Sequence, residues 1–162
     1  MKRNLFTILL LCIFAGSYAQ SLTFEDLLNL TSMTNAQAHD FLTASKGFKS
    51  AGFQMVNGEN IEQYKSSGRT PDKTETLLLG VNTKGFGGNM HRAVTYLTLL
   101  EQDISSFLAE AKRSTLTLIF KGSDLNKNFY RFDNSLFRAN ISLSFDKKSG
   151  AVEVQQKEYA GN

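Results

Sequence analysis

Apolar and polar residues alternate without interruption near the C-terminal end of the chain, between residues 137 and 146. A period of two places the two sets on opposite faces of a β-strand, one buried and one exposed. The pattern resumes with Val152 and Val154 after a turn at 148–150, which predicts a neighbouring antiparallel strand. The apolar set of the first strand is Phe137, Ala139, Ile141, Leu143 and Phe145, and the polar set is Arg138, Asn140, Ser142, Ser144 and Asp146.

Three segments have helical spacing instead. Thr23 followed by Asp26, and Thr34 followed by Gln37, have the spacing of capping boxes that begin helices. Lys46-Gly47 is expected to end the second helix, because a cation favours the last turn and glycine adopts a positive φ. The apolar stripes of the three predicted helices are Phe24/Leu27/Leu28, Ala38/Phe41/Leu42 and Ile104/Phe107/Leu108/Ala111.

The remaining apolar segments predict strands. Asn57-Gly58 is a hairpin signal, and the stretches 66–72 and 84–89, rich in glycine and polar residues, predict loops. Segment 93–100 is apolar on both faces, so it is interpreted as a strand with a helix as the alternative. Besides the two strands above, the predicted strands cover residues 51–55, 59–66, 74–81, 93–100, 116–120 and 129–132.

The resulting order is helix, four strands, helix, four strands. It predicts an α+β protein with an antiparallel β-sheet covered on one face by helices, in one compact domain. The halves are residues 20–100, which open with two helices, and 101–162. Residues 41–46 resemble residues 107–112 at an offset of 66, which favours two tandem helix-plus-four-strand units. Chance similarity between two amphipathic helices is the alternative.

The N-terminus predicts a cleaved signal peptide at residues 1–19. Lys2 and Arg3 precede an apolar run at 5–15, and the small residues of 17–19 suit cleavage after Ala19. The run is shorter than the roughly 20 residues that span a bilayer, so a retained membrane anchor is the less favoured alternative. We expect a bacterial protein that is exported to the periplasm or secreted, with no stable membrane anchor after cleavage.

Cleavage changes the charge and removes the one cysteine. The full chain has 18 Lys and Arg against 15 Asp and Glu, and losing Lys2 and Arg3 reduces the net charge from +3 to +1. A nearly neutral protein has no global field to attract nucleic acid, so no nucleic-acid partner is expected. Cys12 lies in the predicted apolar run and follows Leu11, whereas a lipoprotein signal has a small residue at that position. Because cleavage removes Cys12, disulfide and thiolate chemistry are excluded for the remaining chain.

Met33-Thr34, followed by Ala38, Phe41 and Leu42 ahead of a β-meander, resembles the opening of a group of small exported domains. The group is typified by beta-lactamase inhibitor protein and the small outer-membrane assembly lipoproteins. The resemblance implies two helices leading into an antiparallel sheet and a role in binding other proteins, without catalysis. The chain departs from the group at Ser32, where the group usually has Gly, and at the end of the second helix, residues 46–48. No binding residue is carried over from the group.

The residues suggest little catalytic chemistry. His39 and His91 are far apart, and neither has metal-ligand spacing to another histidine or a carboxylate. The chain has no nucleophile-elbow, zincin or phosphate-loop motif, so no cofactor and no metal are expected. A metal-independent hydrolase using His39 or His91 with a carboxylate is the enzymatic alternative, and it needs direct hydrogen-bond contact with that carboxylate.

Two segments are candidates for binding. The string Lys84-Gly85-Phe86-Gly87-Gly88-Asn89 could present Phe86 and Lys84 on a flexible tip, or be a plain connection. Tyr130 and Arg131 lie in a segment of interleaved aromatic and basic residues, which suits either a binding surface or a sheet with one buried aromatic face. The leading hypothesis is a non-catalytic module that binds a protein or envelope component through its open sheet face. Carriage of an apolar ligand is a further alternative, which needs a cavity of about 300 Å³.

Overall fold

The computed structural model describes residues 22–56, 59–66, 73–80, 83–84, 90–146 and 148–157. It confirms the predicted α+β class. Three helices, α2 (Phe24–Leu30), α3 (Asn35–Asp40, continued by the π-helical turn η1, Phe41–Ser45) and α4 (Glu101–Arg113), pack against a single large sheet. Its strands are β1 (Phe48–Val56), β2 (Glu59–Ser66), β3 (Thr76–Leu79), β6 (Ala93–Thr98), β7 (Thr117–Ser123), β8 (Lys127–Asp133), β9 (Phe137–Ser144) and β10 (Gly150–Gln156).

The sheet has eight strands in the order β1-β2-β3-β6-β10-β9-β8-β7, and every neighbouring pair is antiparallel. The four strands before α4 and the four after it form two contiguous sets, which meet where β6 pairs with β10. The segment between β3 and β6 contributes a separate two-stranded ribbon, β4 (Thr83–Lys84) with β5 (Met90–His91). The sequence pattern did not predict this ribbon.

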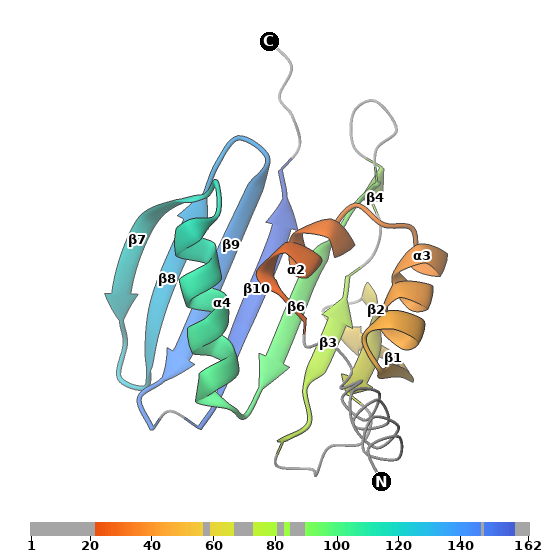
Figure 1. Ribbon diagram of the computed structural model, residues 1–162, viewed down its shortest axis with the longest axis horizontal. Helices are drawn as coiled ribbons and strands as arrows, with labels where there is room; N and C mark the ends of the chain where they lie inside the picture. Colours follow the sequence, from red (N-terminus) through yellow and green to blue (C-terminus); the bar gives the residue numbers. More distant parts are fainter. Residues whose placement is uncertain are drawn as a thin grey trace, which may run out of the picture.

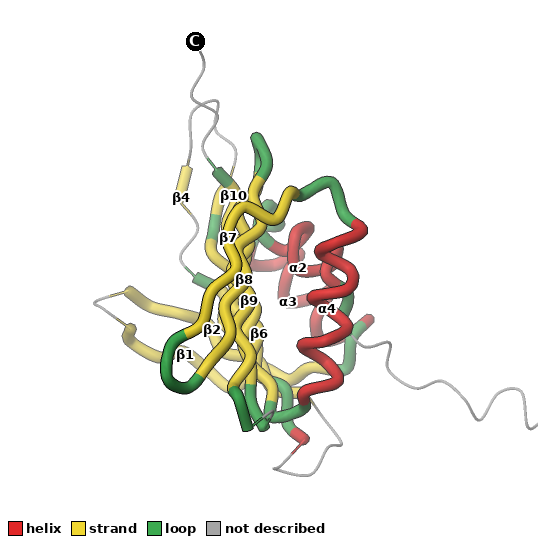
Figure 2. Tube along the Cα trace, turned by 90° about the vertical axis from the view of Figure 1, so that its left-hand side faces the viewer, coloured by secondary structure: helices red, strands yellow, loops and turns green. Residues whose placement is uncertain are grey.

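All three helices lie on the same side of the sheet (Figure 2). Helix α4 contacts β6, β9 and β10, α2 contacts β10 and α4, and η1 contacts β1. Figure 1 shows α4 over the C-terminal set of strands and α3 toward the N-terminal set. The distal parts of β1, β2 and β4 project to the side away from the helices (Figure 2). The sheet therefore has one covered face and one face that no helix covers within the described residues.

The predicted helix ends are confirmed. The Thr23 hydroxyl accepts the Asp26 amide at 3.1 Å, and the Asp26 carboxylate accepts the Thr23 amide at 2.8 Å. Thr34 and Gln37 form the same reciprocal pair at the start of α3. Gly47 ends the second helix with a φ of 70°, a conformation that other residues adopt only with strain.

The core lies between the covered face and the helices. Burying apolar side chains there removes their surface from water. This contributes about 25 cal/mol per Å² of buried apolar area and is the main stabilising contribution to the fold. The alternation predicted for β9 is confirmed, because Ala139 and Ile141 are buried while Arg138 is exposed. The largest buried side chains are Tyr64, Tyr96, Phe24, Phe132, Leu27, Leu30, Leu42, Leu77, Leu79, Ile104, Ile141 and Val94.

Strand β7 differs from the simple alternation of residues 116–120. Leu118 is paired with Phe132 and Phe120 with Arg131, so Ile119 is an extra residue and forms a β-bulge. The bulge reverses the direction of the side chains after it. Leu118 therefore faces the helices, whereas Phe120 faces the open side of the sheet.

Candidate functional site

The open face of the sheet consists of three rows of side chains that cross the strands, with the opposed pair Lys127 and Ser144 beyond the first row. The rows follow from the register, because directly opposed residues of neighbouring strands point to the same side. The first row is Lys49, Lys65, Thr76, Leu97, Ala151, Ser142, Phe129 and Gly122; the second is Gln63, Leu78, Thr95, Glu153, Asn140, Arg131 and Phe120; the third is Ala93, Gln155, Arg138, Asp133 and Thr117. We call the surface formed by these rows the open face.

A groove of about 600 Å³ crosses one end of the open face, and we call it the basic groove. Lys65 of β2 and Lys127 of β8 line its two ends, and both side chains are exposed. Neither lysine has an ion pair with a carboxylate among the described residues. The residues between the lysines are mainly Leu, Ala, Ser, Thr and Gly, namely Thr74, Thr76, Leu97, Thr98, Leu99, Ser142, Ser144, Ser149, Gly150 and Ala151.

A second groove of about 510 Å³ lies beside the first, and we call it the aromatic groove. Phe120 and Phe129 line it, and Phe120 is 54% exposed. Ser142 and Ala151 line both grooves, so the two hollows adjoin. One hollow is lined by cationic side chains and the other by aromatic side chains.

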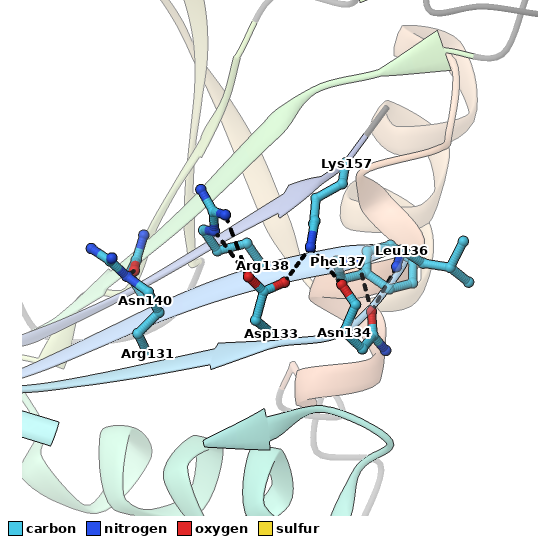
Figure 3. Close-up of polar contacts among 8 residues, drawn as sticks. All are labelled: Arg131, Asp133, Asn134, Leu136, Phe137, Arg138, Asn140 and Lys157. Atoms are coloured by element: carbon cyan, nitrogen blue, oxygen red, sulfur yellow. Dashed lines mark hydrogen bonds and ion pairs between the residues drawn. The ribbon is translucent and has the colours of Figure 1, made fainter. Parts of the chain in front are cut away.

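A hydrogen-bonded chain of three polar side chains forms part of the aromatic groove. The Arg131 Nε donates to Asn140 Oδ1 at 3.0 Å, and the Asn140 amide nitrogen donates to Glu153 Oε2 at 3.3 Å. The three residues come from β8, β9 and β10, and Figure 3 shows Arg131 beside Asn140. These contacts fix the guanidinium and the carboxylate before any ligand arrives, which reduces the entropy lost on binding.

Asp133 holds two cations at the end of the open face toward which β8 runs. Its carboxylate accepts from the Lys157 ammonium at 2.7 Å and from Arg138 at 3.3 Å (Figure 3). The Lys157 ammonium also donates to the Asn134 carbonyl at 2.7 Å, so it fastens the segment after β10 to the β8–β9 turn. The hydrogen bond from Lys157 and its charge lower the pKa of Asp133, with a smaller contribution from Arg138.

Of the four residues that the sequence singled out for binding, the structure describes the side chains of Arg131 and Tyr130, and these point to opposite faces of the sheet. Arg131 lies on the open face, in the aromatic groove. Tyr130 is half-buried and points to the opposite face, where the Lys121 ammonium lies 5.8 Å from its ring centre. Lys84 belongs to β4, but its side chain lies outside the described residues, as does Phe86.

His39 is exposed and does not contact a carboxylate directly. Its Nδ1 lies 3.1 Å from the Tyr64 hydroxyl, which donates to Glu62 Oε1 at 2.7 Å. Since that hydroxyl already donates its proton to Glu62, the geometry assigns the histidine proton to Nδ1. The contact needed by the hydrolase hypothesis is therefore not present at His39, and the side chain of His91 lies outside the described residues.

Two side chains near His39, those of Tyr64 and Arg92, are buried. Desolvation and the Glu62 carboxylate raise the pKa of Tyr64, so the phenol is neutral. Desolvation lowers the pKa of Arg92, and the charge of Glu62 opposes that effect. The Arg92 guanidinium donates to the Met33 carbonyl, which connects the α2–α3 loop to the sheet. These contacts hold α3 in place and account for the environment of His39.

A hollow between α2 and the C-terminal end of α4, lined in part by Phe24, Leu28 and Arg113, has about 500 Å³. The hollow between α4 and the sheet has about 190 Å³, below the size that the carrier hypothesis needs. It is lined in part by Tyr96, Glu75 and Asp103, and the Tyr96 hydroxyl donates to Asp103 at 3.3 Å.

Within the described residues, no group of three or more histidine, cysteine or acidic side chains has the arrangement of a metal site. None of the helices described between residues 22 and 157 combines the length and apolar character needed to cross a bilayer.

Sequence reasoning missed several residues of the two grooves. Asn140 and Ser142 belong to the polar set predicted for β9, so the alternation alone identified their face. Lys65, Lys127 and Glu153 gave no comparable signal, because only the order of the strands brings them to one surface.

Three comparisons with known proteins gave no match. No family model, no curated protein and no solved structure is similar to this chain at a significant level.

Proposed function

We propose that this chain is an exported, non-catalytic binding module that receives a protein or another envelope component on the open face of its sheet. The observation that carries the proposal is the pair of adjoining grooves on the face that α2, α3 and α4 leave uncovered. The proposal of export rests on the sequence of residues 1–19.

The composition of the open face supports this function. Protein-binding surfaces are enriched in aromatic residues and arginine, and their central side chains often lie in well-defined hollows. Phe120, Phe129 and Arg131 meet these criteria in the aromatic groove. Arg131 is also held by Asn140, so it is already oriented in the free protein.

Site-specific photo-crosslinking tests the proposal in the cell that makes the protein. A photoreactive residue at Ser142 would lie between the two grooves, whereas one at Ala109 would lie on the exposed side of α4. We expect a discrete, reproducible adduct from position 142 and none from position 109. Equal adducts from both positions, or none from position 142, would contradict the proposal.

A further inference from the structure

We propose that the ligand of the basic groove is an acidic segment of a partner protein that lies extended across the strands, with a carboxylate side chain near each of Lys65 and Lys127 and, on the same face of the segment, apolar side chains between them. This inference rests on the proposed function and specifies the chemistry of the partner.

The charges of the open face favour an anionic ligand. Lys49, Lys65 and Lys127 are exposed and have no ion pair with a carboxylate among the described residues. Of the two acids of the rows, Asp133 is paired with Lys157 and Arg138, whereas Glu153 accepts from the neutral amide of Asn140 and keeps its charge. Lys49, Lys65, Lys127 and Arg131 outnumber Glu153, so the charge of this face is positive, although the Asp124 carboxylate interacts with the charge of Lys127 and the whole chain without residues 1–19 carries only +1.

The floor of the basic groove favours apolar side chains between the charges. Leu97 and Ala151 are directly opposed in the first row, and the adjacent Leu99 is 51% exposed. A ligand that carried charge alone would leave these aliphatic groups in contact with water. A segment with apolar side chains between its carboxylates covers them and gains about 25 cal/mol per Å² of buried area.

The register sets the length of the segment. Lys65 and Lys127 belong to strands separated by five interstrand steps, from β2 through β3, β6, β10 and β9 to β8. At about 4.8 Å per step, the path along the sheet is roughly 24 Å. An extended chain covers about 3.3 Å per residue, so about seven residues reach from one lysine to the other.

A protein segment fits the groove better than an acidic polysaccharide. A sugar acid would satisfy the two lysines, but it would place hydroxyl groups against the aliphatic floor formed by Leu97, Leu99 and Ala151. The neighbouring aromatic groove offers a further apolar contact through Phe120. Such a contact suits a peptide side chain that extends beyond the lysine-bound segment.

Fluorescence anisotropy with defined probes tests the inference on the purified protein. The main probe is a labelled peptide of seven residues, Glu-Gln-Leu-Gln-Leu-Gln-Glu, which we call the Glu-Leu peptide; when it is extended, its Glu and Leu side chains share one face. A second peptide has Ser in place of each Leu, and a polygalacturonate oligomer represents acidic polysaccharides. We expect the Glu-Leu peptide to bind at least tenfold more tightly than either of the other probes, and its affinity to fall as salt increases.

Two double variants separate the groove from the overall charge. Lys65→Gln with Lys127→Gln is expected to weaken binding of the Glu-Leu peptide at least tenfold. Lys112→Gln with Lys121→Gln makes the same change in net charge on the covered side of the sheet, and is expected to change the affinity less than twofold. Circular dichroism and thermal unfolding of both variants verify that the fold is retained.

The inference is overturned if both double variants weaken binding equally, if the Ser-containing peptide binds as well as the Glu-Leu peptide, or if polygalacturonate binds more tightly. The peptide-binding experiment can fail while the crosslinking experiment succeeds, so the two failures are distinguishable. An adduct from position 142 together with any of these outcomes would refute the acidic segment and leave the proposed function standing, whereas loss of that adduct would refute both.

Discussion

Arg131 and Asn140 are directly opposed on β8 and β9, and the guanidinium Nε donates to the amide oxygen at 3.0 Å. Because Asn140 also donates to Glu153, one amide side chain orients a cation and an anion on the open face. The central position of Asn140 makes it the natural place to disturb the surface without removing either charge.

We therefore predict that Asn140→Ala weakens recognition while leaving the fold intact. The yield of the adduct from a photoreactive residue at position 142 should fall at least fivefold, because Arg131 and Glu153 lose the group that orients them. The free energy of unfolding should fall by no more than about 1 kcal/mol, because Asn140 is half-buried and loses two hydrogen bonds at the surface. Asn29→Ala makes the same change at an exposed position of α2. It should leave the adduct yield unchanged and change the free energy of unfolding by less than about 0.5 kcal/mol. An unchanged yield for Asn140→Ala would contradict the assigned role.

The Asp133 ion pairs predict a pH-dependent contribution to stability. Lys157 and Arg138 lower the pKa of Asp133 in the folded protein, so its contribution is present above the unfolded value of about 4 and is lost as the pH falls through the lowered pKa. At pH 7 we expect Asp133→Asn to reduce the free energy of unfolding by about 0.5–1 kcal/mol, a modest amount because solvent screens the pairs. Urea unfolding of both proteins, from pH 7 to below the lowered pKa, should show the difference disappearing.

Asp124→Asn is the matched control for that series. The pKa of Asp124 is also lowered, but mainly by hydrogen bonds from the backbone amides of Asn126 and Lys127, which an asparagine oxygen can still accept. Its effect at pH 7 should therefore be smaller than that of Asp133→Asn. A difference between wild type and Asp133→Asn that stays constant down to the lowest pH would show that the ion pairs are not its source.

The chain from His39 through Tyr64 to Glu62 predicts a structural role for the Tyr64 hydroxyl. Tyr64→Phe removes the donor to Glu62 and the acceptor for His39, and should cost about 1 kcal/mol of unfolding free energy. Tyr130→Phe makes the same chemical change at a half-buried ring whose hydroxyl has no hydrogen bond among the described residues. We expect it to change stability by less than about 0.5 kcal/mol. Chemical denaturation of the two variants gives the comparison, and equal losses would contradict this account.

Local patterns predicted the fold well because their causes are local. The alternation of residues 137–145 depends only on the two-residue period of a strand, and the Thr23 and Thr34 caps depend only on residues three positions away. The bulge at Ile119 was not predicted, since it depends on how β7 pairs with β8. The same bulge turns Phe120 toward the open face and so creates part of the aromatic groove.

The candidate site was less predictable because it depends on distant pairings. The adjacent residues Tyr130 and Arg131 were predicted together, but the two-residue period places them on opposite faces. Lys65 and Lys127 come from different halves of the chain, and only the meeting of β6 with β10 places them at two ends of one groove. Nothing within a short stretch of sequence encodes that relationship.

Thiol labelling at two adjacent residues of β9 tests most directly whether the open face is the occupied surface. In a chain with Cys12→Ser, we expect Ser142→Cys in the purified protein to react with a maleimide at least tenfold faster than Ile141→Cys, which faces the helices. In the cells that make the protein, the thiol at position 142 should react at least fivefold more slowly than in the purified protein, whereas one at Ala109 on α4 should react at the same rate in both. Equal rates at positions 141 and 142, or no protection at position 142 in cells, would contradict the account.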